Sequence, residues 1–259
     1  MRHAAFALCL VLSAASAASA NPQLVESARA SYVSLERQGL ARFTCSVALN
    51  WNAILAVAFR AQPETGKQVE SALVGRPLSV TVSVHKPVKV ALGEAASAGN
   101  GQQAQLIELV ATGVNAMLSG VLTVWSSYVL TSPFPASSTP FELTDQAGQW
   151  LLSYTDGANK IELTVGKDYM IRIMRSSFSG SSTVVQPAFA QTIRGLLLSA
   201  FQAESRSQPA EPPTPLQARF DYQQIEGFDL PKTITLSSSQ GGTQLEMVAT
   251  FGNCSTARR

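Results

Sequence analysis

The chain has very few of the side chains on which metal-dependent and nucleophilic catalysis rely. Histidine occurs only at His3 and His85, and the three cysteines are far apart in the sequence. A zinc site needs three or four His, Cys or carboxylate ligands, and a catalytic triad needs a histidine base. His85 is the one histidine beyond the N-terminal segment, so multi-histidine metal sites are excluded and no metal ligands are predicted.

Catalytic sequence motifs are also missing. The chain contains no G-x-S-x-G, no P-loop and no G-x-G-x-x-G. The segment 83–86 (SVHK) matches the S-x-x-K signature of penicillin-recognising enzymes, but neither S-D-N nor K-T-G follows it. Asp145, Asp156, Glu162 and Asp168 are carboxylates of the kind glycosidases use, although Asp156 and Asp168 lie at predicted turns, where Asp is common. We therefore predict a non-enzymatic protein without catalytic residues or cofactor.

Charge is scarce and nearly balanced. Charged residues make up 14% of the chain, with 19 Lys and Arg against 17 Asp and Glu. Such a surface has no electrostatic footprint for nucleic acid or an anionic membrane, so no nucleic-acid partner is expected. The hydrophobic content of 46% is enough to build a sizeable core.

The N-terminus has the anatomy of a secretory signal peptide. Arg2 and His3 form a short basic start, residues 4–11 are apolar but too short to span a bilayer, and 18–20 (ASA) is a small-residue cleavage signature. We predict a signal peptide over residues 1–20, cleaved after Ala20. The mature protein is then expected in the periplasm or secreted.

Two cysteines, Cys45 and Cys254, remain after cleavage. In an oxidising compartment, an even pair suggests a disulfide that fastens the C-terminal segment to an early strand. Two buried free thiols are the alternative, because sequence alone does not supply the geometry of the pair.

Hydrophobic patterning predicts a mostly β domain over residues 21–259. Helical spacing runs from Pro22 to a stop at Gly39, and helical insertions are expected at about 51–74 and 102–132. Alternation predicts strands at 43–49, 78–90, 150–154, 161–165, 169–174, 183–189, 216–222, 233–236 and 245–251. Residues 192–201 fit either a strand or a helix. The fold class is α+β, with a single open antiparallel half-barrel or curved sheet covered by helices.

The segment 102–132 is the most apolar stretch and is predicted to be one long helix. No charged residue occurs from Leu109 through Phe141, so a membrane span was weighed against a core helix, which the interspersed Ser, Thr and Asn residues favour. One row along this helix contains Leu106, Leu109 or Val110, Val114, Met117, Val121, Trp125 and Tyr128. Within this row, Met117, Val121, Trp125 and Tyr128 are the candidate ligand-binding residues. Packing of the same row into a closed core is the alternative.

The order of elements, and two segments in particular, resemble a known family. Residues 31–50 read SYVSLERQGLARFTCSVALN, and residues 220–251 read FDYQQIEGFDLPKTITLSSSQGGTQLEMVATF with a G-x-x-L-P step at 227–231. They are similar to the outer-membrane lipoprotein carrier superfamily (LolA and LolB), in its uncharacterised exported branch. The resemblance implies an open antiparallel half-barrel whose concave apolar face is covered by helices and accepts acyl chains.

Three functional hypotheses follow. The first is an exported, non-enzymatic binding or carrier module for a lipid-like or amphipathic ligand. The second is a structural or interaction protein of the cell envelope with a packed core, an envelope protein as partner and no ligand. The third is a hydrolase that uses His85 and the scattered carboxylates, which the missing motifs disfavour.

Overall fold

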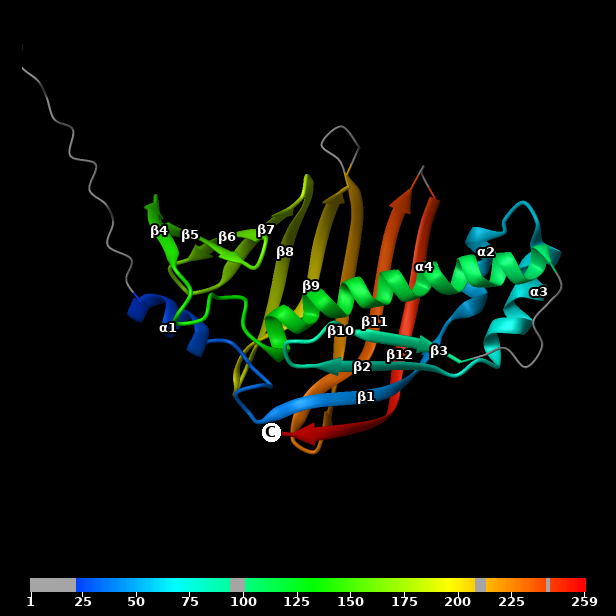
Figure 1. Cartoon of the computed structure of the whole chain (residues 1–259), viewed down its shortest axis with the longest axis horizontal. Helices are drawn as coiled ribbons and strands as arrows, with labels where there is room; N and C mark the ends of the chain where they lie inside the picture. Colours follow the sequence, from blue (N-terminus) through cyan, green and yellow to red (C-terminus); the bar gives the residue numbers. More distant parts are fainter. Residues whose placement is uncertain (1–21, 94–100, 208–212, 241–242) are drawn as a thin grey trace, which may run out of the picture.

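The computed structural model describes residues 22–93, 101–207, 213–240 and 243–259. It shows an α+β protein in which a large antiparallel sheet is accompanied by helices (Figure 1). The predicted signal peptide and its cleavage position lie outside the described residues. The helices are α1 (Pro22–Ala30), α2 (Trp51–Ala58), α3 (Pro63–Val74) and α4 (Gln102–Trp125), which continues as the π-helical turn η1 (Ser126–Leu130). The helices expected within 51–74 and 102–132 are therefore present.

Twelve strands of the described chain form a single sheet. They are β1 (Leu40–Leu49), β2 (Leu78–Ser83), β3 (Lys89–Leu92), β4 (Phe141–Gln146), β5 (Gln149–Asp156), β6 (Asn159–Gly166), β7 (Ile171–Phe178), β8 (Ser181–Thr192), β9 (Gly195–Arg206), β10 (Thr214–Ile225), β11 (Phe228–Gln240) and β12 (Thr243–Arg258). Their spatial order is β3-β2-β1-β12-β11-β10-β9-β8-β7-β6-β5-β4, and every neighbouring pair is antiparallel. The sheet is thus a meander from β4 to β12, extended by β1, β2 and β3 beyond its last strand.

One face of the sheet is apolar and the other is polar, as alternation predicts. In β2 the residues alternate between buried Leu78, Val80 and Val82 and half-buried Ser79, Thr81 and Ser83. In β1 the apolar side chains of Phe43, Cys45 and Val47 are buried, and their cross-strand partners Val82, Val80 and Leu78 share the same face. Because strand side chains alternate with a period of two, each strand contributes half its residues to one core.

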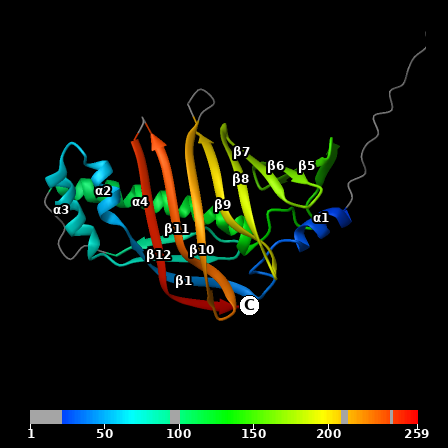
Figure 2. The same cartoon turned by 180° about the vertical axis from the view of Figure 1, so that it is seen from behind.

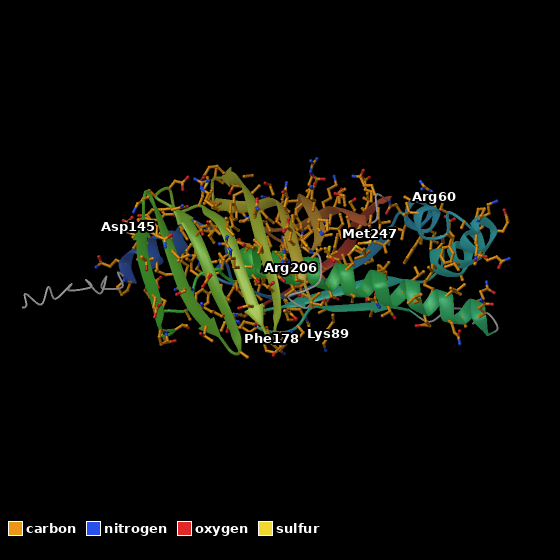
Figure 3. All side chains as sticks on the ribbon, turned by 90° about the horizontal axis from the view of Figure 1, so that it is seen from above. Arg60, Lys89, Asp145, Phe178, Arg206 and Met247 are labelled. Atoms are coloured by element: carbon orange, nitrogen blue, oxygen red, sulfur yellow. A yellow bond between two sulfur atoms is a disulfide. The ribbon has the colours of Figure 1, made fainter. Side chains whose placement is uncertain are left out.

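Helix α4 lies across the sheet as one long rod. Its C-terminal end is near the base of β8, and its N-terminal end reaches α2 and α3 beyond β12, as the front and back views show (Figures 1 and 2). Seen from above, α2 and α3, marked by Arg60, lie at the opposite end of the long axis from β4, marked by Asp145 (Figure 3). The residues that α4 buries are Ile107, Ala111, Val114, Leu118, Val121, Leu122 and Trp125.

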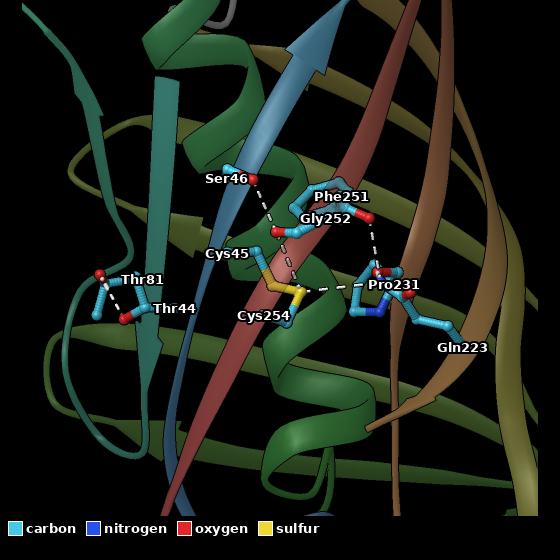
Figure 4. The surroundings of a disulfide bond; sticks show 9 residues. All are labelled: Thr44, Cys45, Ser46, Thr81, Gln223, Pro231, Phe251, Gly252 and Cys254. Atoms are coloured by element: carbon cyan, nitrogen blue, oxygen red, sulfur yellow. Dashed lines mark hydrogen bonds between the residues drawn. A yellow bond between two sulfur atoms is a disulfide. The ribbon is translucent and has the colours of Figure 1, made fainter. Parts of the chain in front are cut away.

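A disulfide joins the first and the last strands in sequence, as predicted. Cys45 of β1 and Cys254 of β12 are bonded, with their Cα atoms 4.1 Å apart (Figure 4). The register between the two strands shifts between Thr44 and Ser46, next to Asn253 with its φ of 47°. The bond is therefore located at an irregular point of the ladder, where it fixes strands separated by 209 positions in the chain.

Two expected elements are wrong in extent. Helix α1 ends at Ala30 rather than continuing to Gly39, because Tyr32 leaves the helix to form a parallel β-bridge with Leu196. The predicted strand over 78–90 is a hairpin of two strands. The chain reverses between β2 and β3 at His85, whose φ is 54°, and Pro87 has no N–H with which to continue the ladder.

Residues 192–201, which fit either a strand or a helix by sequence, belong to strands β8 and β9. A further strand, β4, was not predicted. Most of its side chains are exposed, so its sequence shows little hydrophobic alternation.

Candidate functional site

The four predicted ligand-binding residues lie on or beside the buried side of α4. Val121, Trp125 and Tyr128 are at most 1% exposed, whereas Met117 is half-buried and packs against the core. Of the alternatives Leu109 and Val110, it is Val110 that contacts the core, since Leu109 is 70% exposed. The helix therefore presents an apolar row to the sheet and keeps Leu109 on its outer side.

Trp125 connects α4 directly to both halves of the sheet. Its ring packs edge-on against Phe43 of β1, with centroids 5.8 Å apart. Its indole Nε1 donates a hydrogen bond of 3.0 Å to the hydroxyl of Tyr222 in β10, which in turn donates to the carbonyl of Leu198 in β9. These contacts hold this part of α4 closely against the sheet.

Tyr128 belongs to an aromatic cluster at the C-terminal end of α4. Its ring contacts Phe189 of β8 at 5.8 Å, Phe189 contacts Tyr32 at 5.1 Å, and Tyr32 contacts Phe134 at 5.5 Å. Burial raises the pKa of the Tyr128 hydroxyl, and the nearby Tyr32 and Tyr154 raise it further. The Tyr128 hydroxyl has no hydrogen-bond partner among the described residues.

A second polar atom on the same helix is buried without a partner. The side-chain Oδ1 of Asn115 accepts no hydrogen bond within the described part of the chain. A buried polar group left unsatisfied costs about 1–3 kcal/mol. Asn115 and Tyr128 are thus two places along α4 where an added polar group would lower the energy of the protein.

A polar cleft of about 480 Å³ opens beside the aromatic cluster. It lies between the segment that follows α1, the loop after η1, the β2–β3 turn and the end of β5. Its charged or titratable lining residues are Arg29, Glu36, Arg37, His85 and Asp156, and its other lining residues include Ser34, Thr131, Ser132, Phe134, Ser137, Thr139 and Tyr154. The walls of this cleft come from segments far apart in the chain, so no local sequence pattern predicts it.

Of the candidate catalytic groups, His85 and Asp156 both line the polar cleft, whereas Asp145, Glu162 and Asp168 do not. His85 lies in the β2–β3 turn, with its side chain 71% exposed and its Nε2 3.2 Å from Glu36. Three of the carboxylates considered above form ion pairs: Asp145 with Lys167, Glu162 with Lys160 and Asp168 with Arg172. Across the described ranges, no group of three or more His, Cys, Asp or Glu residues has the arrangement of a metal site.

The continuous helix formed by α4 and η1 is long and apolar enough to cross a membrane by length and composition. The most apolar 18-residue window within residues 102–130 has a mean hydropathy of 1.6, and 33% of that window is buried in the protein. Core helices of soluble proteins meet the same criterion. The contacts of Trp125 with Phe43 and Tyr222 place the C-terminal part of this helix in the protein core.

Comparison with known proteins gives no relative for this chain. No family model, no curated protein and no solved structure matches it. The function is therefore inferred from its residues and their geometry.

Proposed function

We propose that this is an exported, non-enzymatic binding or carrier module for a lipid-like or amphipathic ligand. The ligand-binding residues are Met117, Val121, Trp125 and Tyr128, and the apolar part of the ligand lies between α4 and the facing sheet. The supporting observation is that α4 presents a long uncharged row to an apolar sheet face, yet Asn115 Oδ1 in α4 and Tyr128 Oη in η1 are buried without a hydrogen-bond partner among the described residues. An amphipathic ligand would supply both apolar contacts and polar partners.

We further propose that the sheet acts as an open half-barrel, as in the LolA and LolB carriers that the sequence resembles. In this arrangement, α4 is the cover over the concave face. The twelve-stranded open sheet and the long apolar helix support the proposal. A hydrophobic site with a few placed polar groups is the usual form of a small-molecule pocket.

Entry of the ligand requires α4 to move, and its two ends are held differently. At the C-terminal end, the backbone N–H groups of Leu35 and Glu36 donate to the carbonyls of Val129 and Leu130, both at 2.9 Å. At the N-terminal end, the contact between Arg76 and Glu108 is a long ion pair of 3.8 Å. The helix therefore opens at its N-terminal end and pivots on η1.

Export into an oxidising compartment is the proposed location, either the periplasm or the exterior. The disulfide between Cys45 and Cys254 is compatible with such a compartment. The proposal assigns residues 1–20 to a cleaved signal peptide.

The decisive experiment uses Trp125 as a reporter of ligand contact. In a Trp51→Phe, Trp150→Phe variant, Trp125 is the only tryptophan left. Titration with a fatty acid brominated along its chain should quench most of its fluorescence, because bromine quenches on contact. The same fatty acid without bromine is the control for changes caused by binding alone. Unchanged Trp125 emission at saturating ligand would overturn the proposed site.

A matched pair of variants tests the face of the helix that binds. Met117→Glu places a carboxylate on the core side of α4, and Leu109→Glu places one on the exposed side. Burying a carboxylate next to an acyl chain is unfavourable, so Met117→Glu should weaken binding at least about tenfold. Leu109→Glu should bind like the parent protein. Equal affinities in the two variants would contradict the proposal.

The second candidate function is a structural or interaction protein of the envelope with no ligand. The hydrogen-bonded packing of Trp125 against Tyr222 favours it, since this part of the row is closed. A photo-crosslinker at the exposed Leu109 should then trap one specific envelope protein in intact cells. Lipid found bound to the protein isolated from its native envelope would instead favour the carrier.

A further inference from the structure

The cleft beside the aromatic cluster carries a second inference, which rests on the proposed function. We propose that it binds the zwitterionic head group of the amphipathic ligand. The anionic part of the head group binds at Arg37 and its ammonium group binds at Asp156. The chemical class is an acidic group joined by a short linker to a primary amine.

The charges that line the cleft are neutralised except for one of each sign. Arg29 pairs with Glu26 at 2.7 Å, while Glu36 pairs with both His85 at 3.2 Å and Arg259 at 2.6 Å. Within the described residues, Arg37 and Asp156 form no ion pair, and both line the cleft. A cleft with one available cation and one available anion is complementary to a zwitterion.

Arg37 is fixed in place by its own loop. Its Nη2 donates to the carbonyls of Arg29 at 2.9 Å and Tyr32 at 2.6 Å. These bonds use one of the three guanidinium nitrogens, and the remaining donors suit the oxygens of a phosphate or carboxylate. The cation is therefore positioned before the ligand arrives.

Hydroxyl groups supply the remaining polar contacts of the cleft. The lining residues with a hydroxyl group are Ser34, Thr131, Ser132, Ser137, Thr139 and Tyr154. All of these except Thr139 also make a hydrogen bond within the protein, so each of those five offers a ligand only its remaining donor or acceptor capacity. Hydroxyls both donate and accept hydrogen bonds, so they suit the ester and hydroxyl oxygens that accompany a lipid head group. A purely anionic head group would instead face Asp156 without a compensating cation of its own.

A chain of contacting aromatic rings connects the wall of the cleft to the buried side of α4 and η1. Phe134 lines the cleft and contacts Tyr32, which contacts Phe189, which contacts Tyr128 of η1. This chain of rings leads from the polar site to the buried side of the helix. A head group held in the cleft would direct its acyl chains along these rings toward Trp125.

Isothermal titration calorimetry with three soluble probes tests the inference on the exported chain. Dihexanoyl phosphatidylethanolamine carries the zwitterion and tails, dihexanoyl phosphatidylglycerol lacks the amine, and O-phosphoethanolamine lacks the tails. The variants are Arg37→Gln and Asp156→Asn, with the exposed Arg219→Gln on β10 as a control outside the cleft. Asp156 lies in the β5–β6 hairpin beside Gly157, and Asn is equally suited to such a turn, so this variant should fold.

The expected result is that Asp156→Asn weakens binding of the ethanolamine lipid about tenfold and leaves the glycerol lipid unchanged. Arg37→Gln should weaken both lipids, and Arg219→Gln neither. Arg37→Lys, which keeps the positive charge, should recover part of the loss if Arg37→Gln acts through charge rather than through misfolding of its loop.

Three other results would overturn the inference, each in a different way. If both cleft variants bound the ethanolamine lipid as tightly as the parent protein, the head-group site would be refuted. The proposed carrier function would not be affected. If O-phosphoethanolamine bound as tightly as the dihexanoyl lipid, the acyl tails would contribute nothing to affinity. The ligand would then be a free zwitterion, and the carrier function would be refuted. Failure of all three probes, with Trp125 still quenched by a brominated fatty acid, would refute the head-group site alone.

Discussion

Trp125 and Tyr222 are joined by a hydrogen bond of 3.0 Å between the indole Nε1 and the phenol oxygen, which connects the long helix to the middle of the sheet. Trp125 is buried and Tyr222 is partly buried against the core, and the Tyr222 hydroxyl donates in turn to the Leu198 carbonyl. In an apolar interior, such a bond specifies one position of the helix along the sheet, because a shift would leave polar groups unpaired.

Removing this bridge should destabilise the protein. Tyr222→Phe deletes the hydroxyl that accepts from the Trp125 indole N–H and donates to the Leu198 carbonyl. Both groups lose this hydrogen-bond partner, so the free energy of unfolding should fall by about 1–3 kcal/mol. Urea denaturation monitored by circular dichroism would measure the change. Tyr169→Phe is the matched control, because its ring stacks on Trp150 and its backbone carbonyl accepts from Tyr32, whereas its hydroxyl has no hydrogen bond within the described part of the chain. Equal stability of the two variants would show that the bridge contributes nothing.

Tyr128→Phe should have the opposite effect on the ligand-free protein. The hydroxyl is buried without a partner, so its removal is expected to raise stability by up to about 1–3 kcal/mol. If a ligand normally satisfies this hydroxyl, the same variant should bind fatty acid more weakly. Thermal unfolding of delipidated protein and a binding titration would test the two effects separately. A loss of stability in delipidated Tyr128→Phe would contradict the structural account.

The disulfide should contribute much of the folding stability. Crosslinking strands that are 209 residues apart restricts the unfolded chain strongly, and the expected effect is about 2–5 kcal/mol. The Cys45→Ser, Cys254→Ser double variant should lose this amount in guanidinium unfolding. A reducing agent should reproduce the loss in the parent protein but leave the double variant unchanged. If the reductant affected both proteins equally, the effect would not come from this bond.

Stability should fall in alkaline solution. Burial raises the pKa of Tyr32, Tyr128, Tyr154 and Tyr222 above the ordinary value of 10.0. Each phenol therefore keeps its proton longer in the folded protein than in the unfolded chain. Their contribution is complete below pH 10 and is lost as the pH rises through the folded values, with a slope of up to about 1.4 kcal/mol per pH unit for each group.

Ultraviolet absorbance at 295 nm during a pH titration would check this prediction. Phenolate formation by these four residues should coincide with loss of the circular dichroism signal of the sheet. Ionisation of all four while the sheet signal stays intact would show that the phenols are accessible in the native state.

Gly195 should not tolerate a side chain. Its φ is 117°, and a Cβ there would lie 2.5 Å from the Ser31 carbonyl oxygen, which accepts the hydrogen bond of Leu196. Backbone strain alone costs about 1–3 kcal/mol of stability. Gly195→Ala should cost more, because the steric clash is added to the strain. Gly39→Ala provides the comparison, because its φ is 93° but a Cβ there meets open space. Thermal unfolding of both variants should rank Gly195→Ala as the less stable.

Local patterns in the sequence predicted most of the fold. Half-buried strands such as β2 and β6 alternate strictly, and the long apolar segment is the helix α4. The predictions that were wrong concern features that depend on contacts between residues far apart in the sequence. Tyr32 has helical spacing with Leu24 and Ala28, but it leaves the helix. Its hydroxyl donates to the Tyr169 carbonyl and accepts from the Ile171 N–H, and the backbones of its neighbours Ser31 and Val33 bond to Leu196 of β9.

The site was predictable only in part. The row predicted on α4 was right for Val114, Val121, Trp125 and Tyr128, which are buried, whereas its other members Leu106, Val110 and Met117 are half-buried. It missed the buried residues Ile107, Ala111, Leu118 and Leu122, and the choice of Val110 over Leu109 required the structure. The polar cleft leaves no local signal, because Arg37 and Asp156 are more than a hundred positions apart and each resembles an ordinary surface charge. Ligand binding at either place remains a prediction.

The pairing of β1 with β12 has a consequence for the order of folding. Strand β1 cannot acquire this neighbour until the last strand has been synthesised, and β2 and β3 are attached to the sheet only through β1. Contacts of such long sequence separation form slowly. The early part of the chain therefore stays open until synthesis is nearly finished, and the sheet is completed, and then crosslinked by Cys45 and Cys254, as one of the last steps of folding.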